Sequence, residues 1–481
     1  MNKQKLYDII NSKADMFTSL SDEIWGFAEL SLLEKKSSDL YKKLLAEEGF
    51  KVEENIAGVE TAFTGTYGSG KPVIGILAEF DALSGLSQIA CSTKREELVP
   101  GGNGHGCGHH LLGAGSFAAA VAVKEYLKEK GEGNGTVIFY GCPGEEGGAA
   151  KAFMAREGIF YALDCALTWH PGSSNEIMTG TYNTSIQVEY KFTGVAAHAA
   201  GNPHMGRSAL DAVELMNVGC NFLREHMPRT DLLHYAITDA GGPSPNVVQP
   251  TAQVLYMVRS NNVPNALKLL ERVDNIAKGA ALMTDTTITR RFIDGTADVI
   301  PNKVLEKALY DNFEDAGLPT YTQEEWDYAN ALYATYEHDH LPGHGTAYDP
   351  DIKKFVKEKT ENGTRAINDF VMPFFHSENL NAGSTDVGDV SWQTPTAQIT
   401  TATWPSVAPG HSWQNVSAGK SSMAHKAMLY AGRILAATAY DLYENPAIIE
   451  EAKAEFKEKT EAGYICPIEK DAVPTVSGTK M

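Results

Sequence analysis

Residues 73–78 read Val-Ile-Gly-Ile-Leu-Ala, the first of three short apolar runs that decide the fold class. The other two are Thr-Val-Ile-Phe-Tyr at 136–140 and Ala-Leu-Thr-Trp at 166–169. Apolar runs of this length, without alternation, are typical of strands buried on both faces. An alanine-rich segment at 110–128 lies between the first two runs and has a helical pattern. This order predicts an α/β fold with a mostly parallel central sheet.

Helices are also predicted on either side of these runs. The patterns place them at 5–30, 36–48 and 418–444. Between the last strand and the C-terminal helix, the segment 322–375 is rich in aromatic, charged and histidine residues and has no clean period. We expect it to decorate the site that the rest of the chain forms.

The pattern changes in the middle of the chain. Residues 185–192 alternate strictly, with Ile186, Val188, Tyr190 and Phe192 on one face, as a half-solvated strand would. Further strands are expected at 232–238, 253–259 and 286–292. Two helices lie between them, one with Leu215, Val218 and Phe222 on one stripe and one with Leu269, Val273 and Ile276. The order βαββαβ is that of a ferredoxin-like domain.

We therefore predict a small domain inserted into a larger one. The catalytic domain would comprise residues 1–182 and 299–481, and the inserted domain residues 183–298.

Composition and charge exclude several classes of protein. The chain has 481 residues, of which 43% are hydrophobic and 21% charged, as in a globular protein of two or three domains. Its formal charge of −20 disfavours nucleic-acid and anionic-membrane partners. Six sparse cysteines are typical of free thiols in a reducing compartment. With no export signal or membrane span visible, we expect a cytoplasmic protein.

Side chains with catalytic chemistry follow the predicted strands. Asp81, the pair Glu145 and Glu146, and His170 each come within a few residues of a strand end. Ligands of such sheets bind in the crevice outside the carboxyl ends of the strands. The sequence therefore predicts a site at this edge.

The strongest motif is Gly-His-Gly-Cys-Gly-His-His at 104–110, which opens the alanine-rich helix. Cys107 and His109 can present a thiolate and an imidazole to one point while the glycines keep the backbone tightly turned. The alternative is a glycine-rich helix entry with a buried cysteine. Three histidines within six residues favour a site, because a core leaves them short of partners.

The second motif, Cys-Pro-Gly-Glu-Glu-Gly-Gly at 142–148, places two adjacent carboxylates at a strand end. Such carboxylates are often only solvated. Neighbouring side chains point in different directions, however, so Glu146 can bind a metal while Glu145 faces the substrate. That division suits a metallohydrolase, in which the second carboxylate takes a proton from water.

Two isolated histidines complete the set. His170 lies in Trp-His-Pro at 169–171 and His411 in Pro-Gly-His-Ser at 409–412, and each alone would be interpreted as structural. Together the motifs supply enough ligands for two divalent ions, with Glu145 left as the base. The predicted ligands are Cys107, His109, Glu146, His170 and His411.

Three other functional motifs do not account for the sequence. Residues 65–71 match most of a phosphate-binding loop, but Pro72 stands where a serine or threonine belongs, and we interpret the segment as a hairpin turn. The sequence has no G-x-S-x-G motif, which argues against a serine hydrolase of the α/β type. Cys107 as a bare nucleophile would leave the carboxylates and the other histidines unexplained.

The motifs resemble those of the two-metal aminoacylase/carboxypeptidase family. Within it, the chain is similar to the branch that holds the indole-acetyl-amino-acid, hippurate and aminobenzoyl-glutamate hydrolases, and most similar to the last. The match covers nearly the whole chain in order. The motifs that carry it, besides those quoted above, are Ala-Ala-His-Ala (196–199), Ala-Glu-Phe-Asp-Ala-Leu (78–83), Gly-Arg-Ser-Ala-Leu-Asp-Ala-Val-Glu-Leu-Met-Asn (206–217), Pro-Asn-Val-Val (245–248) and Ser-Thr-Asp-Val-Gly-Asp-Val-Ser-Trp (384–392). His110 departs from the branch, which usually has asparagine or aspartate there.

The resemblance implies a zinc-exopeptidase-like catalytic domain, an inserted domain that acts as a lid and dimerisation domain, and roles for single residues. Cys107 would bridge two ions, one completed by Glu146 and His411 and the other by His109 and His170. The remaining roles fall to five residues: Glu145 would be the base, Asp81 would orient a ligand, His198 would reach across a dimer to the oxyanion, and Asn246 and Arg259 would hold the substrate.

The function that follows is metal-dependent hydrolysis of an amide bond. We expect N-acyl amino acids with a free carboxylate, such as p-aminobenzoyl-glutamate, as substrates. A dipeptidase, a deacylase of aliphatic N-acyl amino acids and a non-catalytic ligand-binding relative are the alternatives. The expected ions are zinc or manganese, although cobalt or nickel also suits the ligands. The chain would form a homodimer or pair with a related subunit.

Overall fold

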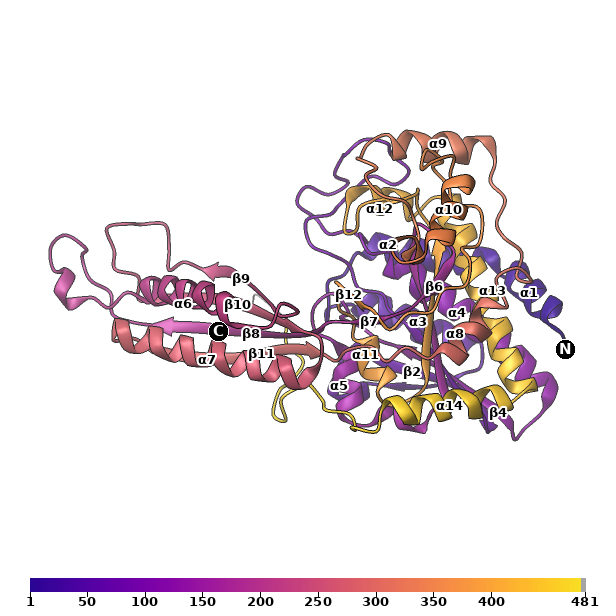
Figure 1. The fold of residues 1–481 in the computed structure, drawn as a ribbon, viewed down its shortest axis with the longest axis horizontal. Coiled ribbons are helices and arrows are strands. Elements are labelled where there is room, and N and C mark those ends of the chain that lie inside the picture. The colour runs from indigo at the N-terminus through magenta and orange to yellow at the C-terminus, as the bar shows by residue number, and fades with distance from the viewer. Residues whose placement is uncertain (477–481) are drawn as a thin grey trace.

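The computed structural model describes residues 1–476, which form two parts (Figure 1). Residues 184–296 extend from one side of the molecule, and we call them the arm. The other described residues form the body, which is built on a seven-stranded sheet.

Four parallel strands form the centre of the body sheet. Neighbouring strands follow in the order β1 (Lys51–Glu54), β2 (Phe63–Gly70), β4 (Asn134–Gly141), β3 (Val73–Ala78), β5 (Cys165–Gly172), β13 (Thr396–Ala402) and β6 (Glu176–Met178). Strands β4, β3, β5 and β13 run parallel, whereas β1, β2 and β6 pair antiparallel at the edges. The predicted α/β fold with a mostly parallel central sheet is confirmed.

Helices cover both faces of this sheet. In β3, Ile74 and Ile76 point to the face covered by α4 (His109–Lys130) and α13 (Ser422–Glu444), while Leu77 points to the face near α5 (Ala150–Arg156) and α11 (Val387–Ser391). Helix α4 lies between the sheet and α13, so nearly all of its side chains are buried. Its alanines and glycines permit this close packing.

The N-terminal helix that the sequence predicts at 5–30 is two helices. The break falls at Lys13, whose backbone leaves the helical region and whose ammonium pairs with Glu48. The remaining elements of the body are α1 (Lys3–Ser12), α2 (Ala14–Phe27), α3 (Lys35–Glu47), β7 (Thr181–Tyr182), α8 (Lys303–Tyr310), α9 (Gln323–Tyr333), α10 (Pro350–Lys359), β12 (Leu380–Asn381), α12 (Trp413–Ala418) and α14 (Ala447–Lys459).

The predicted hairpin turn at 65–71 is wrong, because β4 lies between β2 and β3. The glycines there serve a different purpose. Gly68 has a φ of +88°, and a Cβ atom on it would lie 2.4 Å from the carbonyl oxygen of Gly135 in β4. They therefore permit a close approach of two strands rather than a turn.

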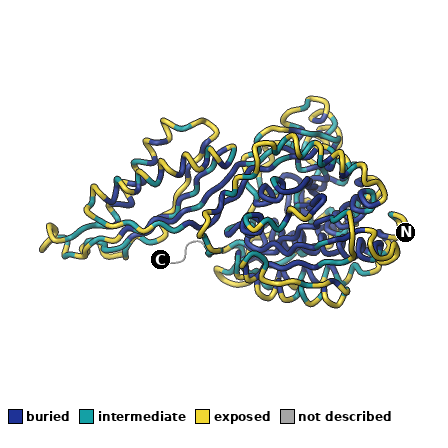
Figure 2. The backbone as a smooth tube through the Cα atoms, turned by 90° about the horizontal axis from the view of Figure 1, so that it is seen from below, coloured by how far each residue is buried: buried dark blue, intermediate teal, exposed yellow. Residues whose placement is uncertain are grey.

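The arm has the predicted βαββαβ order. Its elements are β8 (Thr184–Thr193), α6 (Ala209–Leu223), β9 (Leu232–Asp239), β10 (Thr251–Ser260), α7 (Val263–Thr284) and β11 (Thr287–Thr296), with the strands in the order β11-β8-β10-β9. Strand β9 is thus an edge strand. The alternating apolar residues of β8 are fully or almost fully buried beneath the two helices. In Figure 2 the strands of the arm are coloured buried or intermediate along much of their length, whereas its helices also show exposed residues.

One predicted apolar stripe faces solvent instead of the arm core. Leu215, Val218 and Phe222 of α6 are 37%, 49% and 70% exposed. The core is filled by another face of the same helix, which includes Val213 and Met216. The stripe therefore forms an apolar surface on the outside of the arm.

None of the helices between residues 1 and 476 is long and apolar enough to cross a membrane. All six cysteines are free thiols, as the sequence predicted.

Candidate metal centre

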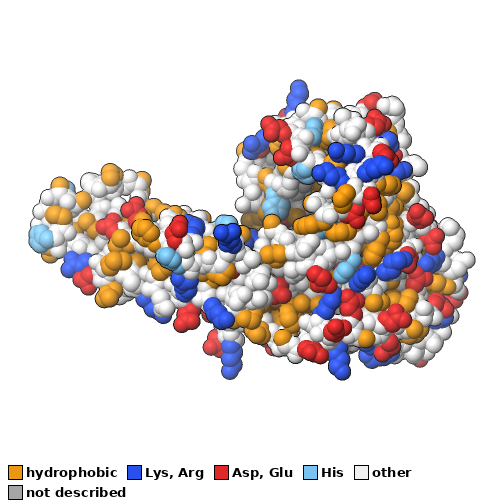
Figure 3. Space-filling view, viewed as in Figure 1, with side chains coloured by type: hydrophobic (Ala, Val, Ile, Leu, Met, Phe, Trp, Pro, Cys, Tyr) orange, Lys and Arg blue, Asp and Glu red, His pale blue; other side chains and the backbone are white. Residues whose placement is uncertain are grey.

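A cavity of about 710 Å³ lies where the arm meets the body, and the hollow is visible in Figure 3. The body contributes the carboxyl ends of its central strands. The arm contributes the face of its sheet that its helices leave uncovered. Among the lining residues are Glu79, Cys107, Glu145, Glu146, His170 and His411 from the body, and Gln187, His234, Met257, Arg259 and Asp294 from the arm.

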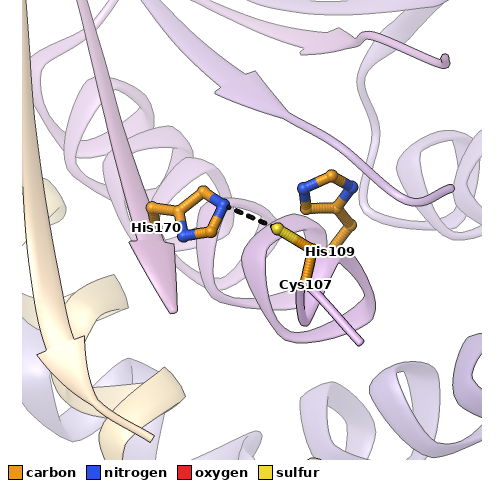
Figure 4. A group of neighbouring side chains, drawn as sticks. All are labelled: Cys107, His109 and His170. Atoms are coloured by element: carbon orange, nitrogen blue, oxygen red, sulfur yellow. Dashed lines mark hydrogen bonds between the residues drawn. The ribbon is translucent and has the colours of Figure 1, made fainter. Parts of the chain in front are cut away.

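The glycine-rich loop sets Cys107 and His109 at the start of α4 (Figure 4). Gly108 has a φ of +82°, and a Cβ atom there would lie 2.8 Å from the ring of Trp404. A Cβ atom on Gly106 would lie 3.3 Å from the Cα atom of His411. Glycine is thus required at position 108 for the turn into the helix, and glycine at position 106 lets the loop pass close to His411.

The first group of possible ligands comprises Cys107, His109 and His170, with one atom of each within 4.8 Å of the others. The Sγ atom of Cys107 lies 3.4 Å from Nε2 of His170, which comes from β5 (Figure 4). The Nδ1 atom of His170 lies 2.8 Å from the Pro171 carbonyl oxygen and donates to it. Burial lowers the pKa of His170 to about 4, which keeps its ring neutral and its Nε2 lone pair free.

The second group comprises Cys107, Glu146 and His411. The Oε1 atom of Glu146 lies 3.4 Å from Nε2 of His411. His411 has a φ of +51°, a left-handed conformation that non-glycine residues adopt mainly where the surroundings hold them in place. The predicted ligand residues therefore form two groups that share the thiol of Cys107.

The residues of both groups fit divalent ions. The buried atoms His109 Nε2 and Glu146 Oε1 have no hydrogen-bond partner in the described chain, although buried polar atoms are rarely left unpaired. Thiolate, imidazole and carboxylate suit zinc and similar cations. Ligands about 2.0–2.3 Å from one ion at a tetrahedral angle are about 3.3–3.5 Å apart. The separations of 3.4 Å in the two groups match this geometry.

Glu145 lies beside both groups and lines the cavity. Its Oε2 atom is 3.9 Å from Nε2 of His109. Burial raises the pKa of Glu145 well above its usual value, and the carboxylates of Glu79 and Glu146 raise it further. A carboxyl group with a raised pKa is suited to take a proton from water and release it later.

Arg259 reaches the same cavity from β10 of the arm. Its Nη1 atom donates to the hydroxyl of Ser384 in the body at 2.9 Å. Burial lowers the pKa of Arg259, and the described residues offer it no carboxylate within ion-pair distance. A half-buried guanidinium with no protein counter-ion is suited to bind a carboxylate ligand.

His198 and Asn246 lie together on the arm but do not line this cavity. The amide of Ala199 donates to the carbonyl oxygen of Asn246, and the side chains of His198 and Asn246 are exposed. The Nδ1 atom of His198 accepts from the amides of Ala200 and Gly201, at 3.2 and 3.0 Å. In the neutral ring the proton is therefore on Nε2, which is free to donate.

A model of "Peptidase family M20/M25/M40" matches residues 78–372, more than half of the chain. The chain belongs to this family. It is 43% identical to a p-aminobenzoyl-glutamate hydrolase subunit of Escherichia coli, over 97% of this chain and 98% of that protein. It is 26% identical to the mouse Xaa-Arg dipeptidase, over 95% of this chain and 92% of that one.

A solved M20 structure has the same fold. The Bacillus subtilis YXEP protein, described as a dinuclear metal-binding peptidase, is 15% identical to this chain and superposes with a TM-score of 0.52. The match covers 90% of this chain and 99% of the YXEP chain. As an M20 peptidase, the chain is a hydrolase that acts on amide bonds, which confirms the predicted enzyme class and the resemblance stated above. The predicted non-catalytic alternative is thereby set aside.

The sequence did not indicate three charged residues beside the centre of this M20 peptidase: Glu79, Lys151 and Asp386. Lys151 is fully buried between the other two, with its Nζ atom 2.7 Å from Glu79 Oε1 and 2.5 Å from Asp386 Oδ1. A usable signal existed for Glu79, which directly follows β3 in the same motif as Asp81. Lys151 and Asp386 sit at helix starts, where charged residues are usually solvated.

His110, the departure from the branch, is structural. Its Nε2 atom lies 3.0 Å from the carbonyl oxygen of Gly419, and its ring is 4.7 Å from that of His105. It therefore joins α4 to the loop before α13 and belongs to neither ligand group.

The segment 322–375 does not line the cavity of this M20 peptidase. Instead, Leu332 of α9 packs with Trp404, whose ring lies against Gly108. The segment thus supports the glycine-rich loop from behind.

Proposed function

We propose that this chain hydrolyses the amide bond of N-acyl amino acids, with p-aminobenzoyl-glutamate as the leading substrate. The observation that carries the proposal is the pair of ligand groups around Cys107, with Glu145 beside them and Arg259 in the same cavity. The high identity to the E. coli hydrolase subunit supports the choice of substrate.

Two divalent ions per chain, zinc or manganese, would be held by the five ligand residues. Cys107, His109 and His170 would hold one ion, and Cys107, Glu146 and His411 the other. Bound there, the ions would polarise the scissile carbonyl and lower the pKa of water to about 7. The thiol of Cys107 favours zinc.

The protein groups would divide the remaining work. Glu145 takes a proton from the attacking water and passes it to the leaving amine, since its carboxylate faces the cavity beside both groups. Arg259 holds the carboxylate of the amino-acid part with its planar guanidinium. His198 of a partner subunit donates from Nε2 to the oxyanion.

His198 lies outside the cavity of its own chain, so it would act on the oxyanion in the cavity of a partner subunit. The surface that would receive a partner is apolar: the exposed stripe of α6 lies near β9, where Tyr235 and Ile237, on the helix side of the sheet, are 40% and 45% exposed. An exposed edge strand with apolar side chains is suited to pair with another chain. The assembly would be a homodimer or a pair with a related subunit; the E. coli relative is named as a subunit.

We also retain the predicted domain boundaries, 1–182, 183–298 and 299–481, and a cytoplasmic location. The arm sheet begins at Thr184 and ends at Thr296, which supports the domain boundaries. The free thiols support the cytoplasmic location.

A dipeptidase that releases basic residues is the second candidate. The mouse relative is an Xaa-Arg dipeptidase, and Asp294 lines the cavity. Asp294 accepts a hydrogen bond from Gln187, and burial raises its pKa to about 7. A carboxyl group that is partly protonated at neutral pH is a weak counter-ion for arginine, which favours the first candidate.

A substrate panel tests the proposal. Purified protein loaded with zinc or manganese would be given p-aminobenzoyl-glutamate, N-acetyl amino acids and Xaa-Arg dipeptides, and the released amino acid would be measured. We expect the highest kcat/KM for p-aminobenzoyl-glutamate. A higher value for the Xaa-Arg dipeptides would support the second candidate instead, and no hydrolysis of any acyl amino acid would contradict the proposed substrate class.

A further inference from the structure

His234 of the arm points into the cavity. Its neighbour in β9, Leu233, is 3% exposed and packs beneath the arm helices, so His234 lies on the opposite face of the sheet, which the helices leave uncovered. There it lines the cavity together with Met257 of β10, its cross-strand neighbour. The imidazole of His234 makes no hydrogen bond or ion pair with another residue between 1 and 476. It is therefore available to a ligand.

The register of the sheet places His234 diagonally across from Arg259. Arg259 pairs with Leu232, two residues before His234, so the two side chains share one face on adjacent strands. Diagonal neighbours of this kind are roughly 7–8 Å apart, within reach of long side chains. Burial lowers the pKa of His234, and the positive charges of Arg259 and Arg224 lower it further. The guanidinium of Arg259 and the imidazole thus act on each other across the cavity wall.

The cavity holds few other basic groups. Among the described residues that line it, Arg259 stands without a second arginine or a lysine, and His234 is the one histidine outside the proposed ligand set. The acid nearest to this wall in the arm, Asp294, is at the far end of the same row of side chains. That row runs from Asp294 in β11 through Gln187 and Met257 to His234 in β9. Two strands therefore separate the carboxyl group from the imidazole.

The leading substrate has two carboxylates, and Arg259 accounts for one of them. We propose that His234 donates to the side-chain carboxylate of an acidic amino acid while Arg259 holds the α-carboxylate, an inference that rests on the proposed function. A neutral or a charged imidazole has an N–H group for this purpose. His234 is thus a residue that determines specificity and takes no part in the chemical step.

The spacing favours glutamate over aspartate. The two carboxylate carbons can lie about 5 Å apart in glutamate and about 4 Å apart in aspartate, which has one bond fewer between them. Because His234 and Arg259 are diagonal rather than direct neighbours, the wider pair of carboxylates reaches both more easily. The alternative is a solvent-facing histidine on an edge strand, whose removal would leave the kinetics of every substrate unchanged.

The test compares p-aminobenzoyl-glutamate with p-aminobenzoyl-glutamine, in which an amide of the same size replaces the side-chain carboxylate. Both are given to metal-loaded wild type, His234→Ala and His234→Lys, each checked for a wild-type thermal unfolding transition. We expect wild type to favour the glutamate compound by at least about 10-fold in kcat/KM.

In His234→Ala the KM for the glutamate compound should rise by at least about 10-fold, because one charge-assisted hydrogen bond is lost. Its kcat, and both constants for the glutamine compound, should stay within about 3-fold of wild type. His234→Lys restores a cationic donor and should keep the preference for glutamate. The matched control is His226→Ala, which alters an exposed histidine of the arm outside the cavity lining and should behave as wild type.

Three results would overturn the proposal: a wild type without the preference, a preference that survives in His234→Ala, or an equal loss for both compounds in that variant. Failure of the proposed function would look different, since wild type would then cleave neither compound. Calorimetric binding of the two compounds to the same proteins still decides in that case, because the same fold differences are expected in Kd.

Discussion

Asp81 and His109 form a buried pair in which Oδ1 of the carboxylate lies 2.7 Å from Nδ1 of the ring. The other oxygen, Oδ2, accepts from the hydroxyl of Ser31 at 2.7 Å and from the amide of Glu146 at 2.9 Å. Burial alone would raise the pKa of Asp81, but His109 and these hydrogen bonds hold it well below its usual value. Asp81 thus turns Nε2 of His109 towards the cavity and also positions Glu146.

Asp81→Asn should weaken metal binding. The amide cannot anchor Nδ1 of His109 as a carboxylate does, so we expect affinity for the ions to fall about 10–100-fold. Chelator competition measures this. Ser31→Ala, which removes only one hydrogen bond to Asp81, is the matched control and should lose less than about 10-fold. Unchanged affinity in Asp81→Asn would show that the contact does not support the centre.

Glu145→Gln should separate catalysis from metal binding. The amide cannot accept the proton, so kcat should fall by about 10²–10⁴-fold, while elemental analysis still finds two ions per chain. Glu306→Gln alters another buried carboxylate, one that contacts His376 away from the cavity lining, and should keep near-normal activity. Normal turnover by Glu145→Gln would end the assignment of the base.

His198→Ala and Glu145→Gln should complement each other in a homodimer. Each variant alone should be nearly inactive. After subunits are mixed and exchanged, about half of the dimers are hybrids, and in each hybrid one site has both Glu145 and the partner's His198. The mixture should therefore regain about one quarter of the wild-type rate, measured as p-aminobenzoate release. No recovery despite proven exchange would mean that His198 does not act across the interface.

The pH dependence of stability should reflect Asp389. Burial raises its pKa to about 8, although Tyr464 donates to Oδ1 at 2.7 Å. Between pH 4 and 8 the unfolded chain has the carboxylate ionised while the folded chain keeps it protonated. The unfolded state binds fewer protons, so this group's contribution to stability falls as the pH rises through that window.

Asp389→Asn removes this dependence. Relative to wild type, the variant should gain of the order of 1 kcal/mol per pH unit between pH 5 and 8, because an amide stays neutral throughout. Denaturant unfolding at several pH values measures the difference. A difference that does not change with pH would contradict the protonated state of Asp389 in the folded protein.

The sequence predicted the parts of the fold that depend on local pattern. The three central strands are apolar because both of their faces are covered, and Cys107, His170 and His411 stand in glycine turns or at strand ends. Their convergence followed from the shared edge of parallel strands. The insertion was visible because its strands alternate.

The features that could not be predicted from the sequence depend on contacts between residues far apart along the chain. The partners of Lys151 lie in other elements, so its burial leaves no local pattern. The stripe of Leu215, Val218 and Phe222 has the pattern of a core face, because a helix shows the same periodicity whether it packs on its own chain or on a partner. Gly68 and Gly70 allow a close approach of neighbouring backbone, but in the sequence such glycines look the same as those of a turn.

The central claim is a pair of ions that this chain requires to cleave an acyl amino acid. Its most direct test is a titration of zinc or manganese into chelator-stripped wild-type protein while p-aminobenzoate release from p-aminobenzoyl-glutamate is recorded. We predict no turnover without metal and a rate that reaches its plateau at two equivalents per chain. A stripped protein that hydrolyses the substrate at the full rate, or a plateau reached with one equivalent, would contradict it.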